Sequence, residues 1–295
     1  MGRAKKLVPR YKGVEHTAVK LPVEAQRWLD GKKRSLQSRR LNHQQTAAQL
    51  LGLVEQYEWS WPDRTIYFFS DLHADAQALT ASLIASGGIK AKGRKRKHLK
   101  LTRQGRKAQF LIGGDCFDKG PSNLELLRTL KRLHHTGANM RILAGNHDVR
   151  VMLGMRSVDR IAAPGCEHFF IRMGPKVVPF LSEINDAYLP RAHKLKGVPG
   201  EQQCRQRLYP PEQWFEEFPR LTADMLPQKM IDKELRRVRE KQADFEQRCA
   251  DAGLSIRRAY AAALQWQRLF LHDRGEFNWF YRRMRLAMQK GSFLF

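Results

Sequence analysis

The sequence predicts an α/β fold, and three observations support this. Between residues 64 and 150, short apolar runs alternate with stretches of helical periodicity. Three of these runs end directly in a cluster of glycine, carboxylate, amide or imidazole residues. With 295 residues, 42% of them hydrophobic, the chain can bury a substantial core, which excludes global disorder despite its formal charge of +25. Alternating strands and helices are typical of parallel α/β layers, which bind ligands at the carboxyl ends of the strands.

Residues 1–60 are predicted to form a basic N-terminal extension that contains helices. Residues 1–20 are polar and show no periodicity. Residues 22–30 and 43–57 carry apolar side chains at helical spacing, which predicts helices with one buried face.

Residues 61–184 are predicted to form the α/β core. Its first strand is the aromatic run at residues 66–69, followed by S-D-L-H and then by a helical pattern that stops at Gly87 and Gly88. The second strand is predicted at residues 110–112 and is followed by G-G-D. A helix over residues 123–135 then leads to the third strand, at residues 140–143, which is followed by A-G-N-H-D.

A dense run of positive charge separates the first two strands. Residues 89–107 contain ten Lys or Arg and no Asp or Glu, whereas the rest of the core is almost neutral. Because like charges repel, residues 90–107 are predicted to be an exposed loop or a hairpin. The run is either a solvated surface or a contact for nucleic acid or another polyanion.

Residues 185–295 are predicted to be a mainly helical insertion that ends at the start of a further core strand. Residues 229–250 repeat apolar side chains in steps of four and three, which indicates a helix with a heptad seam. Residues 255–288 also have helical spacing, so a helical hairpin against the core is expected, with a dimerising coiled coil as the alternative. Residues 292–295 form an apolar, strand-like run.

The polar clusters after the three strands contain ligand types suited to Mn, Fe or Zn ions. The first supplies Asp71 and His73, which follow one strand closely enough to bind one ion. The second supplies Asp115, and the third supplies Asn146. Two metal ions about 3.5–4 Å apart would hold a phosphate and activate a hydroxide.

These clusters resemble the motifs of the calcineurin-like metallophosphoesterases. Residues 71–73 read D-L-H, residues 114–120 read G-D-C-F-D-K-G and residues 145–148 read G-N-H-D. The superfamily has D-x-H, G-D-x-x-D-R-G and G-N-H-[DE] in this order. Residues 114–121 are most similar to the branch of serine/threonine phosphatases and symmetrical bis(nucleosyl)-tetraphosphatases. The resemblance covers residues 64–150 and implies an α/β/β/α sandwich, here incomplete or carrying a helical insertion.

The resemblance implies a role for each matching residue in the metal centre. Asp71 and His73 would bind the first metal ion, and Asp115 would bridge the two ions. Asn146 would bind the second ion and a phosphate oxygen.

The resemblance also implies the groups that act on the substrate. His147 would protonate the leaving oxygen, and Asp118 would orient its ring. Lys119 stands where the family has a phosphate-binding Arg, so it supplies charge without the bidentate fork. Arg150 is a further candidate for a phosphate contact.

The chain departs from the family after the third cluster. The family has further metal-binding histidines on later strand ends, and the candidates here are His168, His193 and His272. None of them follows a clear strand in a matching motif, and His272 has a helical context. We therefore expect the chain to be the N-terminal part of a longer phosphoesterase that stops before its next ligand.

The sequence thus predicts a metal-dependent phosphatase that hydrolyses phosphomonoesters of phosphoprotein or nucleotide type. The alternatives are a basic nucleic-acid-binding protein and an inactive phosphoesterase-like scaffold. The absence of an apolar run of about 18 residues argues against a membrane span. Four widely spaced cysteines without a C-x-x-C pair predict reduced thiols and a cytoplasmic protein.

Overall fold

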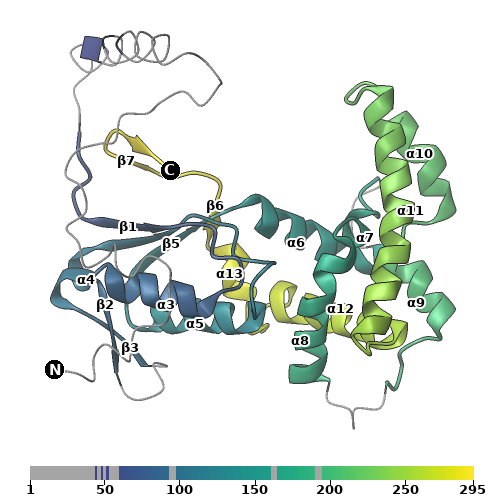
Figure 1. The fold of residues 1–295 in the computed structure, drawn as a ribbon, viewed down its shortest axis with the longest axis horizontal. Helices are drawn as coiled ribbons and strands as arrows, with labels where there is room; N and C mark the ends of the chain where they lie inside the picture. The colour runs from purple at the N-terminus through teal and green to yellow at the C-terminus, as the bar shows by residue number, and fades with distance from the viewer. Residues whose placement is uncertain are drawn as a thin grey trace.

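The computed structural model describes residues 60–92, 98–160, 165–189 and 195–295, together with positions 44, 48, 51 and 52. The predicted helices over 22–30 and 43–57 therefore lie almost wholly outside the described residues. In the described part, the predicted α/β class is confirmed: the chain combines a central parallel sheet with many helices (Figure 1).

The central sheet has four strands in the order β1-β4-β5-β6, and all neighbours run parallel. They are β1 (Ile66–Phe69), β4 (Gln109–Ile112), β5 (Asn139–Leu143) and β6 (Met284–Arg285). The first three are the predicted strands, and β4 is buried along its whole length, as expected for an inner strand of a parallel sheet.

The fourth strand corrects the prediction of a helix over residues 255–288. The chain forms α12 (Ile256–Leu271) and α13 (Asn278–Arg282), and then β6 pairs with β5 so that Met284 lies opposite Ile142. A strand of two residues is too short to show a period of its own. Its hydrogen bonds come from a strand about 140 residues earlier in the chain, so local spacing could not predict it.

The strand-like C-terminal run does form a strand, but it does not join the central sheet. β8 (Phe293–Leu294) pairs antiparallel with β7 (Gln289–Lys290). This hairpin is anchored to the segment before β1, because the Ser292 amide donates to the carbonyl of Ser60 at 2.7 Å.

Two helices connect the strands and lie side by side against the sheet (Figure 1). α3 (Ala76–Ala85) follows β1, and α5 (Asn123–His135) joins β4 to β5. Each begins at a capping side chain, Asp75 for α3 and Ser122 for α5, which accepts hydrogen bonds from the first turn of its helix. These crossovers place the loops after β1, β4 and β5 at one edge of the sheet.

The basic run forms a hairpin within the described residues. β2 (Ile89–Lys92) pairs antiparallel with β3 (His98–Leu101), and α4 (Arg103–Lys107) leads on into β4. Ile89 and Leu101 are buried against the core, and residues 93–97 lie outside the description.

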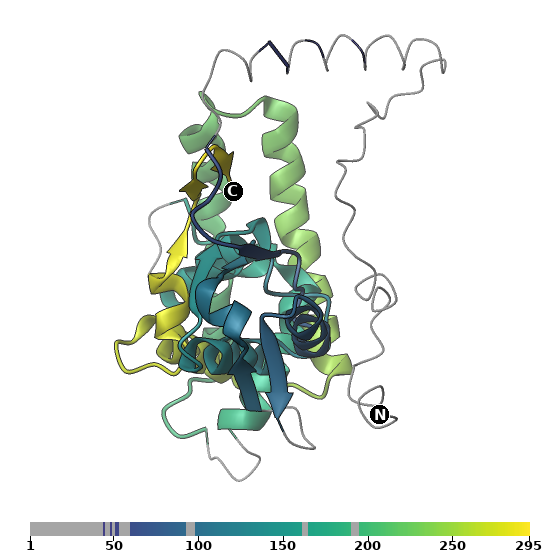
Figure 2. The ribbon, with the colours of Figure 1, turned by 90° about the vertical axis from the view of Figure 1, so that its left-hand side faces the viewer.

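The remaining helices form a second region beside the sheet. α6 leads into this region from β5, and α10 and α11 project from it side by side (Figures 1 and 2). The α-helices are α6 (Asn146–Ser157), α7 (Phe169–Arg172), α8 (Val178–Tyr188), α9 (Glu201–Leu208), α10 (Glu212–Thr222) and α11 (Gln228–Asp251), with 3-10 turns η2 (Val158–Arg160) and η3 (Gly174–Val177).

The heptad seam of α11 is buried within the chain itself. Ile231, Val238, Phe245 and Cys249 are almost inaccessible, and α11 packs against α7 and η3. The expected packed helix is therefore present, and the alternative of a dimerising coiled coil through this seam is wrong. The division of the chain at residues 60 and 184 stays a prediction, with the second boundary inside α8.

Two further properties concern the thiols and the length of the helices. All four cysteines are free thiols, and three of them are buried. No helix in the described part of the chain has both the length and the apolar character needed to cross a membrane.

Candidate functional site

Three loops meet at the carboxyl edge of the sheet. Backbone hydrogen bonds tie the first two together, because the amide of His73 donates to the carbonyl of Asp115 at 2.8 Å and the amide of Ala74 donates to that of Cys116 at 2.7 Å. The third loop joins them where the amide of His147 donates to Oδ1 of Asp115 at 3.0 Å. The strand order thus brings together residues that lie up to 76 positions apart.

Asp71, His73 and Asp115 form a group that could hold a metal ion. One potential ligand atom from each lies within 4.8 Å of the others. Among the residues that the structure describes, no other set of three or more His, Cys, Asp or Glu side chains brings its ligand atoms this close together. Two carboxylates and one imidazole suit a divalent transition metal.

The hydrogen bonding of His73 prepares its ring for a metal. Nδ1 lies 3.3 Å from the carbonyl oxygen of Phe117, and a carbonyl can only accept, so Nδ1 carries the proton. The lone pair is then on Nε2, which faces Asp71 Oδ1 at 3.7 Å. Metal-binding histidines characteristically donate their other ring N–H to a carbonyl or carboxylate, and this arrangement fixes both tautomer and orientation.

The two loops that carry these side chains have an uncommon backbone conformation. Seven described non-glycine residues have positive φ, and six of them lie here. They are Asp71, His73, Ala74, Asp115, Asp118 and Lys119. Such residues cost on the order of 1–3 kcal/mol each and cluster at functional sites, where the surrounding structure holds them in place.

Close backbone contacts explain the glycines of the second and third motifs. A Cβ on Gly120 would lie 1.9 Å from the carbonyl oxygen of His73, and a Cβ on Gly145 would lie 2.1 Å from the amide nitrogen of Asp115. Any side chain at either position would push the loops apart and separate the candidate ligands.

His147 and Asp118 form a buried pair beside the metal group. His147 Nδ1 lies 3.0 Å from Asp118 Oδ2, and both side chains are only 9% exposed. The carboxylate accepts a hydrogen bond from Nδ1–H, so Nε2 is free to contact a ligand. The rings of His147 and His73 are 5.1 Å apart, which places this second nitrogen close to the candidate metal ligands.

Asp148 holds two of the loops together, a role that the sequence reasoning did not assign. Its fully buried carboxylate accepts the amide of Cys116 through Oδ1 and that of Gly145 through Oδ2, both at 2.9 Å. Burial raises the pKa of Asp148 to about 6, although these two donors favour the ionised form. The acidic fourth position of the G-N-H-D motif was the available sequence signal.

Glu183 of α8 is a second residue that the sequence reasoning missed. It accepts four hydrogen bonds at the start of α5, from Ser122 Oγ, the amides of Asn123 and Leu124, and Asn123 Nδ2. Asn123 Oδ1 in turn accepts the amide of Asp118 at 3.1 Å. Glu183 therefore supports the carboxylate that orients His147, and no local motif marks a residue 60 positions away.

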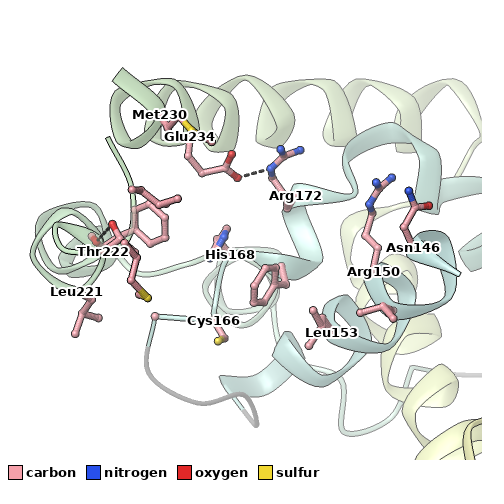
Figure 3. A pocket seen from close by; sticks show the side chains of 16 residues that line it. Asn146, Arg150, Leu153, Cys166, His168, Arg172, Leu221, Thr222, Met230 and Glu234 are labelled. Atoms are coloured by element: carbon pink, nitrogen blue, oxygen red, sulfur yellow. Dashed lines mark hydrogen bonds and ion pairs between the residues drawn. The ribbon is translucent and has the colours of Figure 1, made fainter. Parts of the chain in front are cut away.

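The two candidate phosphate-binding residues come from different elements, the loop after β4 and helix α6. Lys119 Nζ lies 3.2 Å from His73 Nε2, next to the metal group. Arg150 lies one turn after Asn146 on α6, and both line a cavity that extends toward α10 and α11 (Figure 3).

The later histidines are not part of this group. His168 is buried among Phe169, Trp214 and Phe218 in the helical region. His272 follows the end of α12 and is exposed, as its helical context predicted. His193 lies outside the described residues. The three metal-ligand candidates therefore come from two loops, and Asn146 supplies the neighbouring amide.

The fold and the donor set define an α/β protein with a candidate metal centre at the carboxyl edge of its sheet. The family model for calcineurin-like phosphoesterases matches residues 64–237, which is more than half of the chain. The chain therefore belongs to the calcineurin-like phosphoesterases, which usually bind divalent metal ions, and the family implies a hydrolase. No curated protein and no solved structure matches it.

Proposed function

We propose that the chain hydrolyses phosphomonoesters with the help of two divalent metal ions. One observation carries this proposal: the loops after β1, β4 and β5 place the Asp71, His73 and Asp115 group next to the His147 and Asp118 pair. A metal group alone fits a structural site, and an imidazole with a carboxylate alone fits many sites. Their juxtaposition fits the transfer of a phosphoryl group to water.

The residues would share the metal ions as follows. Asp71 and His73 would hold one ion, Asp115 would contact both, and Asn146 would offer its amide oxygen to the other. When bound, the ions supply Lewis-acid charge and lower the pKa of a bound water molecule. Manganese, iron and zinc all suit this mixture of oxygen and nitrogen donors.

The remaining residues would act on the ester itself. When it carries a proton on each ring nitrogen, His147 would donate the one on Nε2 to the leaving oxygen, while Asp118 holds Nδ1. Lys119 and Arg150 would contribute positive charge for the phosphate. Lys119 supplies a point charge where an Arg would supply a bidentate contact, so its contribution is electrostatic.

We place the chain near the branch of serine/threonine phosphatases and bis(nucleosyl)-tetraphosphatases. The run 114–121 supports this placement, and its substrates would be phosphoproteins or nucleotides. The free thiols support a reducing compartment such as the cytoplasm.

Hydrolysis of a generic aryl phosphate tests the proposed function. We expect turnover of p-nitrophenyl phosphate with added Mn²⁺, its loss in the presence of a chelator, and its recovery when Mn²⁺ is restored. Elemental analysis should find two metal ions per chain. An inactive scaffold would show no turnover and at most one weakly bound ion, and that result would remove the enzymatic proposal.

A second candidate function is polyanion binding, which the basic hairpin favours. Lys90 and Lys100 lie directly opposite each other and are exposed, while Ile89 and Leu101 face the core. Neither lysine has an ion-pair partner among the described residues. Opposed like charges destabilise a hairpin, so a polyanion such as nucleic acid would relieve a cost that the free protein carries.

Charge reversal on the hairpin should weaken nucleic-acid binding selectively. We expect Lys90→Glu with Lys100→Glu to lower affinity for a DNA or RNA duplex and to flatten its dependence on salt. The matched control reverses two exposed lysines on α11, Lys229 and Lys233. Equal losses in both double variants, or affinity of the native chain that does not depend on salt, would contradict a hairpin-specific contact.

A further inference from the structure

A cavity of about 770 Å³ opens beside the candidate active site (Figure 3). Its walls come from α6, α7, α10 and the start of α11, so it lies between the sheet's third loop and the helical region. A volume of this order accommodates a drug-sized organic group.

The cavity is lined mostly by apolar side chains. Val149 and Leu153 come from α6, and Phe218 comes from α10. At the far end, Leu221, Met225 and Met230 remain 52%, 72% and 54% exposed. Large apolar side chains that gather around one opening mark a binding surface, and methionine adapts well to apolar ligands.

The near end of the cavity is polar and belongs to the candidate active site. Figure 3 shows Asn146 and Arg150 side by side on α6, with Leu221 and Met230 at the opposite end. Between the two ends, Arg172 donates to the carboxylate of Glu234, which neutralises both charges. Arg150 is thus the cation of the lining without an ion-pair partner among the described residues.

His168 contributes a neutral aromatic ring to the wall of this cavity. The side chain lines the cavity, is only 4% exposed, and has no hydrogen-bond partner at Nδ1 in the described structure. Burial lowers the pKa of His168 to about 4, so its ring is neutral at pH 7. A neutral, uncharged ring is compatible with an apolar ligand in the cavity.

We propose that the cavity binds the apolar alkyl or aryl group of a phosphate ester whose phosphate lies near Asn146 and Arg150. This inference rests on the proposed function, because it assigns the leaving group of the same reaction. The order of charge along the cavity matches such an ester: a cation and an amide at one end, then a neutralised pair and an apolar wall. A nucleoside or a charged peptide would have to bury many polar groups against this wall. This inference therefore narrows the substrates of the proposed function from nucleotides and phosphoproteins to phosphomonoesters with an apolar leaving group.

Affinity should therefore rise with the apolar length of the ligand. Each buried methylene contributes about a three- to fourfold gain in binding, so octylphosphonate should bind on the order of 10²-fold more tightly than butylphosphonate. Naphthyl phosphate against phenyl phosphate provides the aromatic arm of the same comparison. The arm with the steeper gain identifies whether the natural group is aliphatic or aromatic.

The test combines a binding and a kinetic measurement on the full chain with Mn²⁺. Calorimetry with methyl-, butyl- and octylphosphonate measures binding without turnover, and hydrolysis of the matching monoesters gives kcat/KM. Leu221→Glu should remove most of the increase in affinity with alkyl chain length and leave the affinity for methylphosphonate unchanged. Leu271→Glu, at a 37% exposed leucine that does not line the cavity, is the matched control.

The outcomes separate this inference from the proposed function. Hydrolysis of small esters without any gain for octyl or naphthyl groups, or an equal response of both Glu variants, overturns the cavity assignment alone. Tight octylphosphonate binding that Leu221→Glu abolishes, without turnover of any ester, supports the cavity as a ligand site and overturns the catalytic function.

Discussion

Replacing His147 by glutamine should lower kcat by about 10²–10⁴-fold, the usual contribution of a general acid. Glutamine has a similar size but cannot transfer a proton at neutral pH. The ring of His147 lies beside the metal group and is held through Nδ1 by Asp118 at 3.0 Å, so its Nε2 is the donor suited to a leaving oxygen.

The leaving group provides the sharpest measurement of this role. A p-nitrophenolate ion leaves without protonation, whereas an alkoxide does not, so His147→Gln should impair hydrolysis of an alkyl phosphate much more than that of p-nitrophenyl phosphate. The metal content should remain at the native value. His272→Gln, at an exposed histidine after α12, is the control. Equal losses for both substrates would show that His147 positions the site and does not donate the proton.

Local sequence patterns predicted the parts of the fold whose determinants are also local. The helix from Asn123 to His135 appears with the predicted bounds because its cap, its apolar spacing and its final Thr136-Gly137 turn all lie within one short segment. The runs that became β1 and β4 carry enough apolar side chains to identify them as buried strands. Their order then places the polar loops together, since carboxyl ends of parallel strands share one edge.

The missed features depend on contacts between distant parts of the chain. β6 is a strand only because β5 lies beside it. Glu183 supports Asp118 through Asn123 only because α8 packs beside the start of α5. The cavity needs walls from α6 and from α10 and α11, and α10 begins 55 positions after α6 ends. In each case the local residues are ordinary, and their role comes from where tertiary packing places them.

The strained loops show how the motif residues constrain one another. Asp115 has positive φ, its Oδ1 accepts the amide of His147, and its carbonyl accepts that of His73. Gly120 and Gly145, which lie in these loops, leave no room for a Cβ. The motifs therefore encode a backbone arrangement as well as a set of side chains, which is why three short blocks predict a site better than isolated Asp or His residues.

Asp115 should be the residue whose loss has the widest effect, because it contributes to the metal group and to the loop contact at once. We expect Asp115→Ala to reduce activity to the level of the chelated protein and to weaken Mn²⁺ binding by at least about 10²-fold, beyond the usual effect of losing a supporting residue. Calorimetric titration with Mn²⁺ and a thermal melt measure the two roles separately.

Asp115→Asn distinguishes those roles. The asparagine oxygen can still accept the amide of His147, so the melting temperature should stay near the native value, whereas the lost charge should weaken Mn²⁺ binding almost as much as alanine does. Asp232→Ala, at an exposed carboxylate on α11, controls for removal of one negative charge. If Asp115→Asn bound Mn²⁺ as tightly as the native chain, Asp115 would be a structural residue of the loop, and the metal would have to rely on Asp71 and His73 without it.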